Sequence, residues 1–489
     1  METDKNAYKQ ILKATSLFGG VQFINMLASI VKTKIAALFI GVAGVGVFGI
    51  LTSTLTFVQA LTRCGLDLTA VKEIASANNE DKVSESVSLT NQLAFITGVM
   101  GVVMVLVVSP WLSEIAFSNK TYTLFFVTIS IAVLFSQLSV GNMAVLQGLK
   151  ALKRLAKVIT FSSLLSLVPT VVLYYFFGEK GIPWVIVLTA FISFIISRYY
   201  VNQLKIYKHH IPLKKIIANA KHILKSGMFL SLASVINMSV GFIIQIFITN
   251  AGGIFEVGLY NAGFLLINSY VAVFFSALSK DFFPRLVAVS SNTVSVNKTV
   301  NEQANVLLLL ITPIIIIFLV FKAFIVTLLF SDEFLPILGM ISYGILATAF
   351  KAVSWSMGFI LIAKDNAKLY LKTEIVSYTA LLVSIMMGYK INGLTGLGIG
   401  FLIYHILDLI FIKYIVTKNY QFNFNASFYK LFYLCIVQFI IMLSLLYVEN
   451  EVIKYSFMAL VALFSITITI LKLNKYIDFK ALLKRYMKK

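Results

Sequence analysis

Long runs of apolar residues, separated by short polar segments, extend along almost the whole chain. Each run is about 20 residues long, which is the length that an α-helix needs to cross the hydrocarbon core of a bilayer. Strands of a membrane β-barrel would be about 10 residues long and would alternate apolar with polar positions. The pattern therefore predicts an all-α integral membrane protein with fourteen transmembrane helices, at about 14–40, 44–66, 87–112, 122–149, 158–177, 182–200, 226–250, 257–279, 303–330, 335–362, 370–389, 394–416, 428–447 and 452–471.

The composition excludes a soluble enzyme. Of the 489 residues, 59% are hydrophobic and only 12% are charged, and the mean hydropathy is +0.91. The sequence contains no P-loop, no zinc-binding spacing and no catalytic triad outside the apolar runs. Cys64 and Cys435 are too few for a disulfide framework and lack neighbouring metal ligands, so we interpret both as packing residues. We expect no enzymatic activity, no cofactor and no metal site, and energy that comes from an ion gradient or from substrate flow.

The excess of basic residues indicates an orientation. Lys and Arg number 41 and Asp and Glu 20, for a net charge of +21. The basic residues gather in alternate loops and in both terminal segments, at 5–13, 150–157, 198–221 and 472–489. An even number of spans places both termini on the same side of the membrane. Cytoplasmic loops carry such an excess of basic residues, so that side is expected to be the cytoplasm. The net charge then reflects topology, and we expect no nucleic-acid partner.

The chain also repeats itself at a displacement of 212 residues. The Ile-Asn-Met at 24–26 recurs at 236–238, and the Val-Gly-Val-Phe at 45–48 corresponds to the Val-Gly-Leu-Tyr at 257–260. A repeat of six spans places both halves in the same orientation, related by an axis along the membrane normal. Two such lobes would face each other across a central cavity. The expected organisation is an N-terminal six-helix lobe (1–205), a C-terminal six-helix lobe (206–420), and two further helices with a basic cytoplasmic tail (421–489).

Several segments of this arrangement resemble a known family. They are Lys32-Thr33-Lys34-Ile35-Ala36-Ala37-Leu38, the glycine-rich 41–48, Gly65-Leu66 and Val71-Lys72-Glu73-Ile74-Ala75, and in the second lobe 257–260, Phe283-Pro284-Arg285-Leu286 and 358–364. Their order and spacing over about residues 8 to 420, with six-plus-six helices and two more, are similar to the multidrug/oligosaccharidyl-lipid/polysaccharide exporter (MOP) superfamily. Within it, the chain resembles the polysaccharide-transporter branch, the Wzx-type O-antigen flippases or translocases.

The resemblance implies a function. Such flippases move an undecaprenyl-diphosphate-linked oligosaccharide, such as an O-antigen unit, from the cytoplasmic to the outer leaflet of the bacterial inner membrane by alternating access. The partners would be this lipid-linked oligosaccharide, membrane lipid and other polysaccharide assembly proteins. The alternative is a cation-coupled multidrug exporter of the same superfamily, which predicts an acidic lumen. A membrane-bound glycan polymerase or acyltransferase would need large outer loops, and the outer loops here are short.

Basic residues inside spans are the candidates for binding the diphosphate, because a charge at a helix centre is costly. Lys351 lies more than ten residues from either end of its span, near the midplane; the alternative is that it pairs with a carboxylate on a neighbouring helix. Lys32 and Lys34 point to different sides of their helix, so at most one faces the cavity, and Lys32 is preferred. Simple snorkelling to the interface is the other interpretation of both. Lys280 could present a cation at the inward mouth; the alternative is that it anchors its helix end together with Asp281 and Arg285.

Other ionisable groups in spans suggest ion coupling or helix anchoring. His405 and Asp408 lie three residues apart on one helix face and could form a proton site, which Glu374 could join. The alternative is a neutral, packed His405 with Asp408 paired to Lys413. Arg63 and Asp67 lie four apart at a helix end, and are read as an anchoring pair.

Amides inside the predicted spans are candidates for lining the cavity. They are Asn25 and Asn237, which are equivalent in the repeat, with Asn142 and Gln245. Hydrogen bonds between membrane helices are worth only about 0.6 kcal/mol on average. Packing between helices is therefore the competing interpretation for each of these amides.

Overall fold

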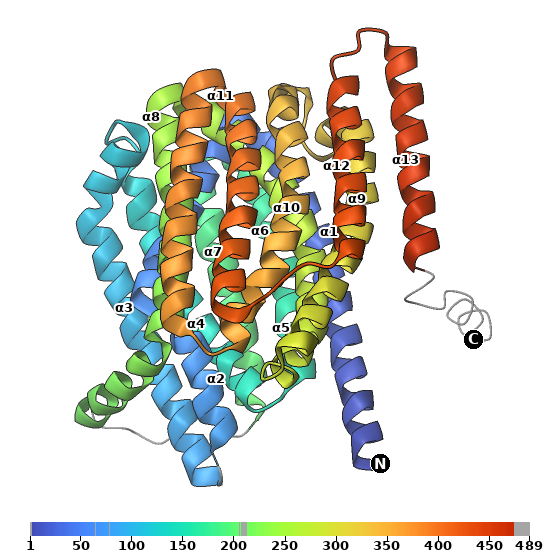
Figure 1. Ribbon diagram of the computed structural model, residues 1–489. Helices are drawn as coiled ribbons and strands as arrows, with labels where there is room; N and C mark the ends of the chain where they lie inside the picture. Colours follow the sequence, from blue (N-terminus) through green and yellow to red (C-terminus); the bar gives the residue numbers. More distant parts are fainter. Residues whose placement is uncertain (1, 64, 78, 205, 207–212, 474–489) are drawn as a thin grey trace, which may run out of the picture. The chain divides into compact units, whose positions relative to one another are not determined.

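The computed structural model describes residues 2–63, 65–77, 79–204, 206 and 213–473, without side-chain detail for 2–19, 67–68, 213–231, 269–274 and 276–281. The described chain is all-helical and has no strands, as predicted (Figure 1). The helices are α1 (Glu2–Arg63), α2 (Leu66–Ser76), α3 (Glu80–Phe117), α4 (Thr123–Gly148), α5 (Leu152–Leu165), α6 (Leu167–Phe177), η1 (Gly178–Gly181), α7 (Ile182–Asn202), α8 (Leu213–Ala288), α9 (Thr293–Leu329), η2 (Asp332–Ile337), α10 (Leu338–Ala363), α11 (Ala367–Tyr420), α12 (Ala426–Leu445) and α13 (Glu451–Leu473).

Ten helical segments of the described chain are long and apolar enough to cross a membrane. The protein is therefore a multi-pass membrane protein. The longest of these segments, such as the 54 residues of Ala367–Tyr420, exceed the roughly 20 residues of a single crossing. Each of three long helices contains a backbone break: α1 at Gly41, α8 at Gly253 and α11 at Asn392 and Gly393. All three glycines have a positive φ, which glycine adopts without the steric cost that a Cβ imposes.

The backbone breaks recur along the chain with the displacement of the sequence repeat. Gly41 (φ 62°) and Gly253 (φ 84°) are 212 positions apart. Further along, Gly178 (φ 52°) and Gly393 (φ 49°) are displaced by 215. The two halves of the sequence thus share the places where the helical backbone is interrupted. The relation of the two lobes by an axis and their boundaries stay predictions.

The described chain divides into two compact units. Unit 1 comprises Met1–Ala262 with Leu328–Phe334, and unit 2 comprises Gly263–Thr327 with Leu335–Lys489. In unit 1, glycines let α1 and α8 approach closely beyond their breaks: a Cβ on Gly258 would lie 1.9 Å from the carbonyl oxygen of Val42. Membrane helices associate through such small residues because lipid supplies no hydrophobic driving force between them.

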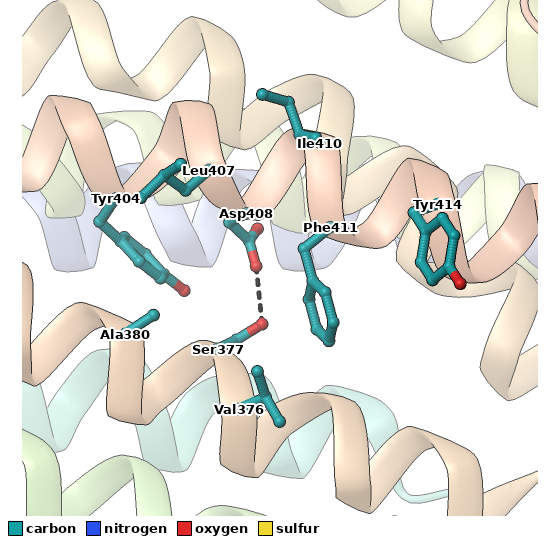
Figure 2. Close-up of a pocket in the computed structure, with 9 residues that line it drawn as sticks. All are labelled: Val376, Ser377, Ala380, Tyr404, Leu407, Asp408, Ile410, Phe411 and Tyr414. Carbon is teal, nitrogen blue, oxygen red and sulfur yellow. Dashed lines mark hydrogen bonds between the residues drawn. The ribbon is translucent and has the colours of Figure 1, made fainter.

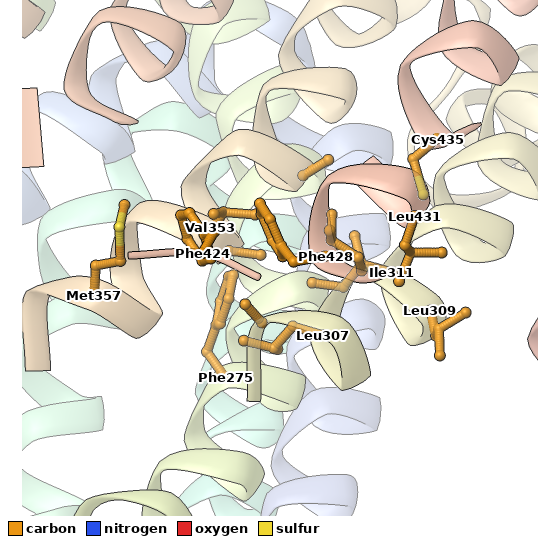
Figure 3. Packing of buried hydrophobic residues seen from close by; sticks show 14 of the residues in the cluster. Phe275, Leu307, Leu309, Ile311, Val353, Met357, Phe424, Phe428, Leu431 and Cys435 are labelled. Atoms are coloured by element: carbon orange, nitrogen blue, oxygen red, sulfur yellow. The ribbon is translucent and has the colours of Figure 1, made fainter. Parts of the chain in front are cut away.

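Unit 2 has its own apolar core, contributed mainly by α9, α10 and α12 (Figure 3). Phe424 and Phe428 stack in it with ring centroids 3.7 Å apart. Cys435 is buried in the same core, as expected of a packing residue; Cys64 lies outside the described residues. Large apolar side chains such as Phe324 (62% exposed) also cover the outside of the unit, as expected of a surface in contact with lipid.

Candidate functional site

A group of polar side chains lies within unit 2, between α8, α10 and α11. Lys351, on α10, is half-buried, and its Nζ donates a hydrogen bond to Oδ1 of Asn268 on α8 at 2.9 Å. An ammonium group has three donors, and this bond uses one of them. No carboxylate of the described residues forms an ion pair with Lys351. The alternative considered from the sequence was that Lys351 pairs directly with a carboxylate on a neighbouring helix. No such pair is present among the described residues.

Asp408 is a carboxylate that interacts electrostatically with Lys351. The break at Asn392 and Gly393 divides α11 into a first arm before it and a second arm after it. Asp408 lies on the second arm, and the Ser377 hydroxyl, on the first arm, donates to its Oδ1 at 2.7 Å (Figure 2). The hydroxyl of Ser354 lies beside the same carboxylate, one turn along α10 from Lys351. Asp408 and Lys351 attract each other electrostatically without touching. The alternative partner Lys413 donates instead to the Tyr429 hydroxyl at 2.7 Å.

The two arms of α11 place Asp408 beside a cavity. Near the break the arms are in backbone contact, since a Cβ on Gly388 would lie 2.2 Å from the Gly396 carbonyl oxygen. Farther from the break, larger side chains separate the arms and leave a cavity of about 450 Å³. It is lined by Val376, Ser377, Ala380, Tyr404, Leu407, Asp408, Ile410, Phe411 and Tyr414 (Figure 2). Its walls are almost entirely apolar. This cavity was not predicted from the sequence, although the glycines at 388, 396 and 400 are a signal for closely packed arms.

His405 lies on the same arm as Asp408 but does not hydrogen-bond to it. The imidazole is 5% exposed and packs edge-on against Phe401, with ring centroids 4.5 Å apart. Neither ring nitrogen has a hydrogen-bond partner among the described residues. Glu374, the third residue of the predicted proton site, is half-buried and hydrogen-bonds to Tyr378, one turn away. It also interacts electrostatically with Asp408, so the two carboxylates belong to one neighbourhood.

The candidate lysines on α1 differ in their contacts. Lys34 donates a hydrogen bond to the carbonyl oxygen of Phe330, within unit 1. Lys32 is half-buried and has no hydrogen bond or ion pair to a described residue. This difference favours Lys32 for binding a ligand, and the assignment stays a prediction. The side chain of Lys280 lies outside the described part of the chain.

Arg63, at the end of α1, has amide partners that the sequence did not suggest. Its Nε donates to Oε1 of Gln137 at 3.2 Å, and its Nη2 donates to Oε1 of Gln59 at 3.3 Å. Gln137 in turn donates to the Thr62 hydroxyl at 3.0 Å. Arg63 therefore ties α1 to α4, which is an anchoring role. Its predicted partner Asp67 lies outside the residues with described side chains.

The candidate cavity amides have varied surroundings. Asn142 is 2% exposed, and its Nδ2 donates to the Ser197 hydroxyl at 3.1 Å, which joins α4 to α7. Gln245 is half-buried and accepts a hydrogen bond from Ser53 at 3.0 Å. Asn237 is exposed. The Oδ1 atom of Asn25 is buried without a described partner. Of these four, Asn142 fits the packing interpretation best.

The sequence matches a family described as polysaccharide biosynthesis protein, over residues 35–339. The chain belongs to this family. No curated protein matches the sequence. The family assignment confirms the resemblance to the polysaccharide-transporter branch of the MOP superfamily.

Solved structures of similar fold are transporters. The inward closed form of the lipid II flippase MurJ has a TM-score of 0.68 at 12% identity, and the match covers 95% of this chain and 99% of that one. An inward-facing multidrug resistance MATE transporter of the MOP superfamily has a TM-score of 0.65 at 14% identity, with 81% and 95% covered. A MOP superfamily transporter from Pyrococcus furiosus, described as having a binding pocket of reverse polarity, has a TM-score of 0.57 at 14% identity, with 83% and 96% covered. This polysaccharide biosynthesis family member thus has the MOP superfamily fold.

Proposed function

We propose that the protein is a flippase for an undecaprenyl-diphosphate-linked oligosaccharide, an O-antigen or related surface polysaccharide unit. It carries this lipid from the cytoplasmic to the outer leaflet of a bacterial inner membrane by alternating access between two six-helix lobes. An ion gradient drives the cycle. The family, whose description is polysaccharide biosynthesis, supports the substrate class. A structural neighbour described as a lipid II flippase supports the type of transport.

Lys351 is the observation that carries this proposal. A diphosphate that enters a region of low dielectric constant loses its hydration, which is prohibitive without compensating cations. Lys351 supplies a half-buried ammonium group in the middle of α10, with a neutral amide as its hydrogen-bonded partner. Its remaining donors can form charge-assisted hydrogen bonds with diphosphate oxygens. Lys32, Lys34 and Lys280 add positive charge along the proposed path.

Asp408 provides a way to release the substrate. While the diphosphate is bound, Lys351 contacts its oxygens. When the conformation changes, the electrostatic attraction between Lys351 and Asp408 competes with the diphosphate for the ammonium group. Binding of a cation or proton at Asp408, with Glu374 and His405 beside it, weakens that attraction and favours the substrate-bound state. Asp408 is in this way the residue through which the gradient acts.

The proposed topology is that predicted from the sequence. Ten helical segments of the described chain are long enough to cross the membrane. Four of them, namely α1, α8, α11 and the segment interrupted at η1, count as two crossings each, which gives fourteen. The N-terminus and the basic 472–489 segment are cytoplasmic, where the latter can lie on anionic lipid at about 1 kcal/mol per basic residue. Other polysaccharide assembly proteins deliver or receive the substrate.

The proposal is tested with purified protein in vesicles that contain a fluorescent polyprenyl-diphosphate glycan. Movement between leaflets is measured by the accessibility of the fluorophore to a membrane-impermeant quencher. The wild type is expected to move the glycan lipid, and Lys351→Ala to move it at the protein-free rate. Lys390→Ala, which removes an exposed lysine of α11, is the matched control and should match the wild type. A Lys351→Ala rate equal to the wild-type rate would contradict the role of this lysine, and a wild type without activity would contradict the function.

A cation-coupled drug exporter is the second candidate. The half-buried carboxylates Glu374 and Asp408, which neighbour each other in α11, favour it because a cation-coupled exporter needs acidic groups to bind the coupling cation. It predicts efflux of a fluorescent cationic dye that Asp408→Asn abolishes and Lys351→Ala leaves intact. The flippase proposal predicts no dye efflux by the wild type or by either variant.

A further inference from the structure

Two lysines of unit 2 meet at one end of the bundle, away from Lys351. The helices α9 and α13 are in contact where the Thr469 hydroxyl donates to the Leu309 carbonyl oxygen at 2.9 Å. Along the axis of α9, Lys322 lies about 20 Å beyond Leu309, at a rise of 1.5 Å per residue. Along the axis of α13, Lys454 lies about 22 Å before Thr469. The two ammonium groups are close enough to repel each other electrostatically. The helices are therefore antiparallel, and both lysines lie at the same level.

The partners of these lysines are neutral oxygens. Lys322 Nζ donates to the Ser342 hydroxyl at 2.6 Å, and Lys454 Nζ donates to the Leu446 carbonyl oxygen at 3.4 Å. Both side chains are half-buried. Within the described part of the chain neither lysine forms an ion pair with a carboxylate. Each ammonium group therefore retains donors that the protein does not use.

A pair of tyrosine hydroxyls lies at the same end of the unit. Tyr343 follows Ser342 at the start of α10, and its hydroxyl is hydrogen-bonded to that of Tyr447 with an O–O distance of 2.6 Å. Tyr447 follows Leu446 in the turn between α12 and α13, the turn that Figure 1 shows joining the two red helices. One hydroxyl of this pair donates to the other, and the second keeps its own hydrogen available.

The two ammonium groups repel each other as long as no anion is present. An anion shared between them replaces this repulsion by two attractive contacts. Lysines that merely snorkel to the interface would extend toward water. Here both instead bond to oxygens of neighbouring elements.

We infer that Lys322 and Lys454, with the hydroxyls of Tyr343 and Tyr447, form a binding site for a lipid-borne phosphate at the end of unit 2 where α12 turns into α13. The phosphate accepts charge-assisted hydrogen bonds from both ammonium groups. It can come from the phosphodiester of a bilayer phospholipid or from a polyprenyl diphosphate. On the proposed orientation this end faces outward, where a translocated diphosphate would leave the protein. The site itself does not depend on the proposed function, because a phospholipid would fill it equally well.

The first test measures binding of two probes, phosphatidylglycerol and geranylgeranyl diphosphate, to the detergent-purified full chain by native mass spectrometry. The double variant Lys322→Gln/Lys454→Gln should bind at least one probe more weakly, by roughly fivefold for each lysine removed. Lys180→Gln/Lys390→Gln, which removes two exposed lysines, should retain wild-type binding. Loss of phosphatidylglycerol alone assigns the site to bilayer lipid, and loss of the diphosphate identifies an exit site. Unchanged binding of both probes would overturn the inference.

A second test remains informative if the double variant does not fold. Lys454→Glu places a carboxylate beside Lys322 and so supplies the missing negative charge from within the protein. It should raise the Tm in lipid-free detergent, and it should reduce the increase in Tm that the probes produce in the wild type. Lys390→Glu serves as the control for a charge reversal elsewhere. A Lys454→Glu protein with a lowered Tm that still responds to the probes as the wild type does would contradict a shared anion site.

Discussion

Two cations inside helices, Arg63 in unit 1 and Lys351 in unit 2, are held in different ways. In unit 1, Arg63 is bonded to the side-chain oxygens of Gln59 and Gln137, which tie α1 to α4. In unit 2, Lys351 has one side-chain hydrogen bond among the described residues, to Asn268, and Asp408 attracts it from a distance. The first arrangement uses the charge to hold helices together. The second keeps donors available, so a ligand can bind there without breaking a structural network.

The difference also concerns the buried polar groups nearby. The amide of Gln137 is fully engaged by Thr62, Gln59 and Arg63. His405 in unit 2 is as deeply buried but has two ring nitrogens without described partners. Unsatisfied buried groups cost about 1–3 kcal/mol each. His405 therefore differs from Gln137 in that this cost is left uncompensated within the described chain.

The largest expected effect comes from removing the cation of unit 2. Lys351→Met should weaken binding of a polyprenyl diphosphate by at least about thirtyfold, because losing one partner of a desolvated charged contact costs about 2–5 kcal/mol. Binding of the uncharged polyprenol should change little. Fluorescence titration of both lipids measures this ratio. Equal weakening for the two lipids would mean that Lys351 acts through packing and not through its charge.

Asp408→Asn should slow translocation roughly tenfold, the effect of about 1.4 kcal/mol, while substrate affinity rises. The neutral amide no longer competes for the Lys351 ammonium group, so the substrate is held more tightly and released more slowly. Single-turnover quenching and equilibrium titration separate the two quantities. Asp408→Glu should restore part of the rate. Parallel losses of rate and affinity would contradict the competition between Asp408 and the substrate.

Arg63→Ala should act on stability and leave the chemistry of transport intact. It leaves the side-chain oxygens of Gln59 and Gln137 without their donor, at about 1–3 kcal/mol. We expect a lower Tm in detergent and a translocation rate per folded molecule within about twofold of the wild type. A normal Tm with a lost rate would place Arg63 in the transport site and remove the contrast between the units.

The smallest effect is expected for His405→Phe. The imidazole packs against Phe401 and Tyr404 and forms no hydrogen bond within the described chain. A phenyl ring of similar shape removes two unsatisfied polar atoms, so Tm should stay constant or rise. Translocation should remain within about threefold and keep its dependence on the ion gradient. Loss of that dependence would make His405, and not Asp408, the coupling residue.

The sequence predicted the features that depend on local pattern. Continuous apolar runs indicated helices, and the displacement of 212 that matched 24–26 to 236–238 also relates the backbone breaks at Gly41 and Gly253. Lys351 stood out because a charge in the middle of an apolar run has no local explanation. Its surroundings were not predictable in the same way.

The contacts that define the two units join residues far apart in the sequence. Ser377 and Asp408 meet only because α11 reverses at Asn392 and Gly393. Arg63 and Gln137 lie 74 positions apart, and neither position carries a signal for the other. The cavity between the arms of α11 results from glycines packing at one end and bulky residues at the other. Such pairings follow from tertiary packing. They leave no periodic pattern in the sequence around either residue, so a single sequence does not predict them.

The most direct test of the account is the distance between Lys351 Nζ and the phosphorus atoms of a bound polyprenyl-diphosphate lipid in bilayers. Solid-state NMR with ¹⁵N-labelled lysine and ³¹P measures it, and the Lys351→Met variant assigns the signal. The account predicts a separation of about 4 Å or less, as in a direct charge-assisted contact, which disappears in the variant. A bound diphosphate whose ¹⁵N contacts persist unchanged in Lys351→Met would contradict it.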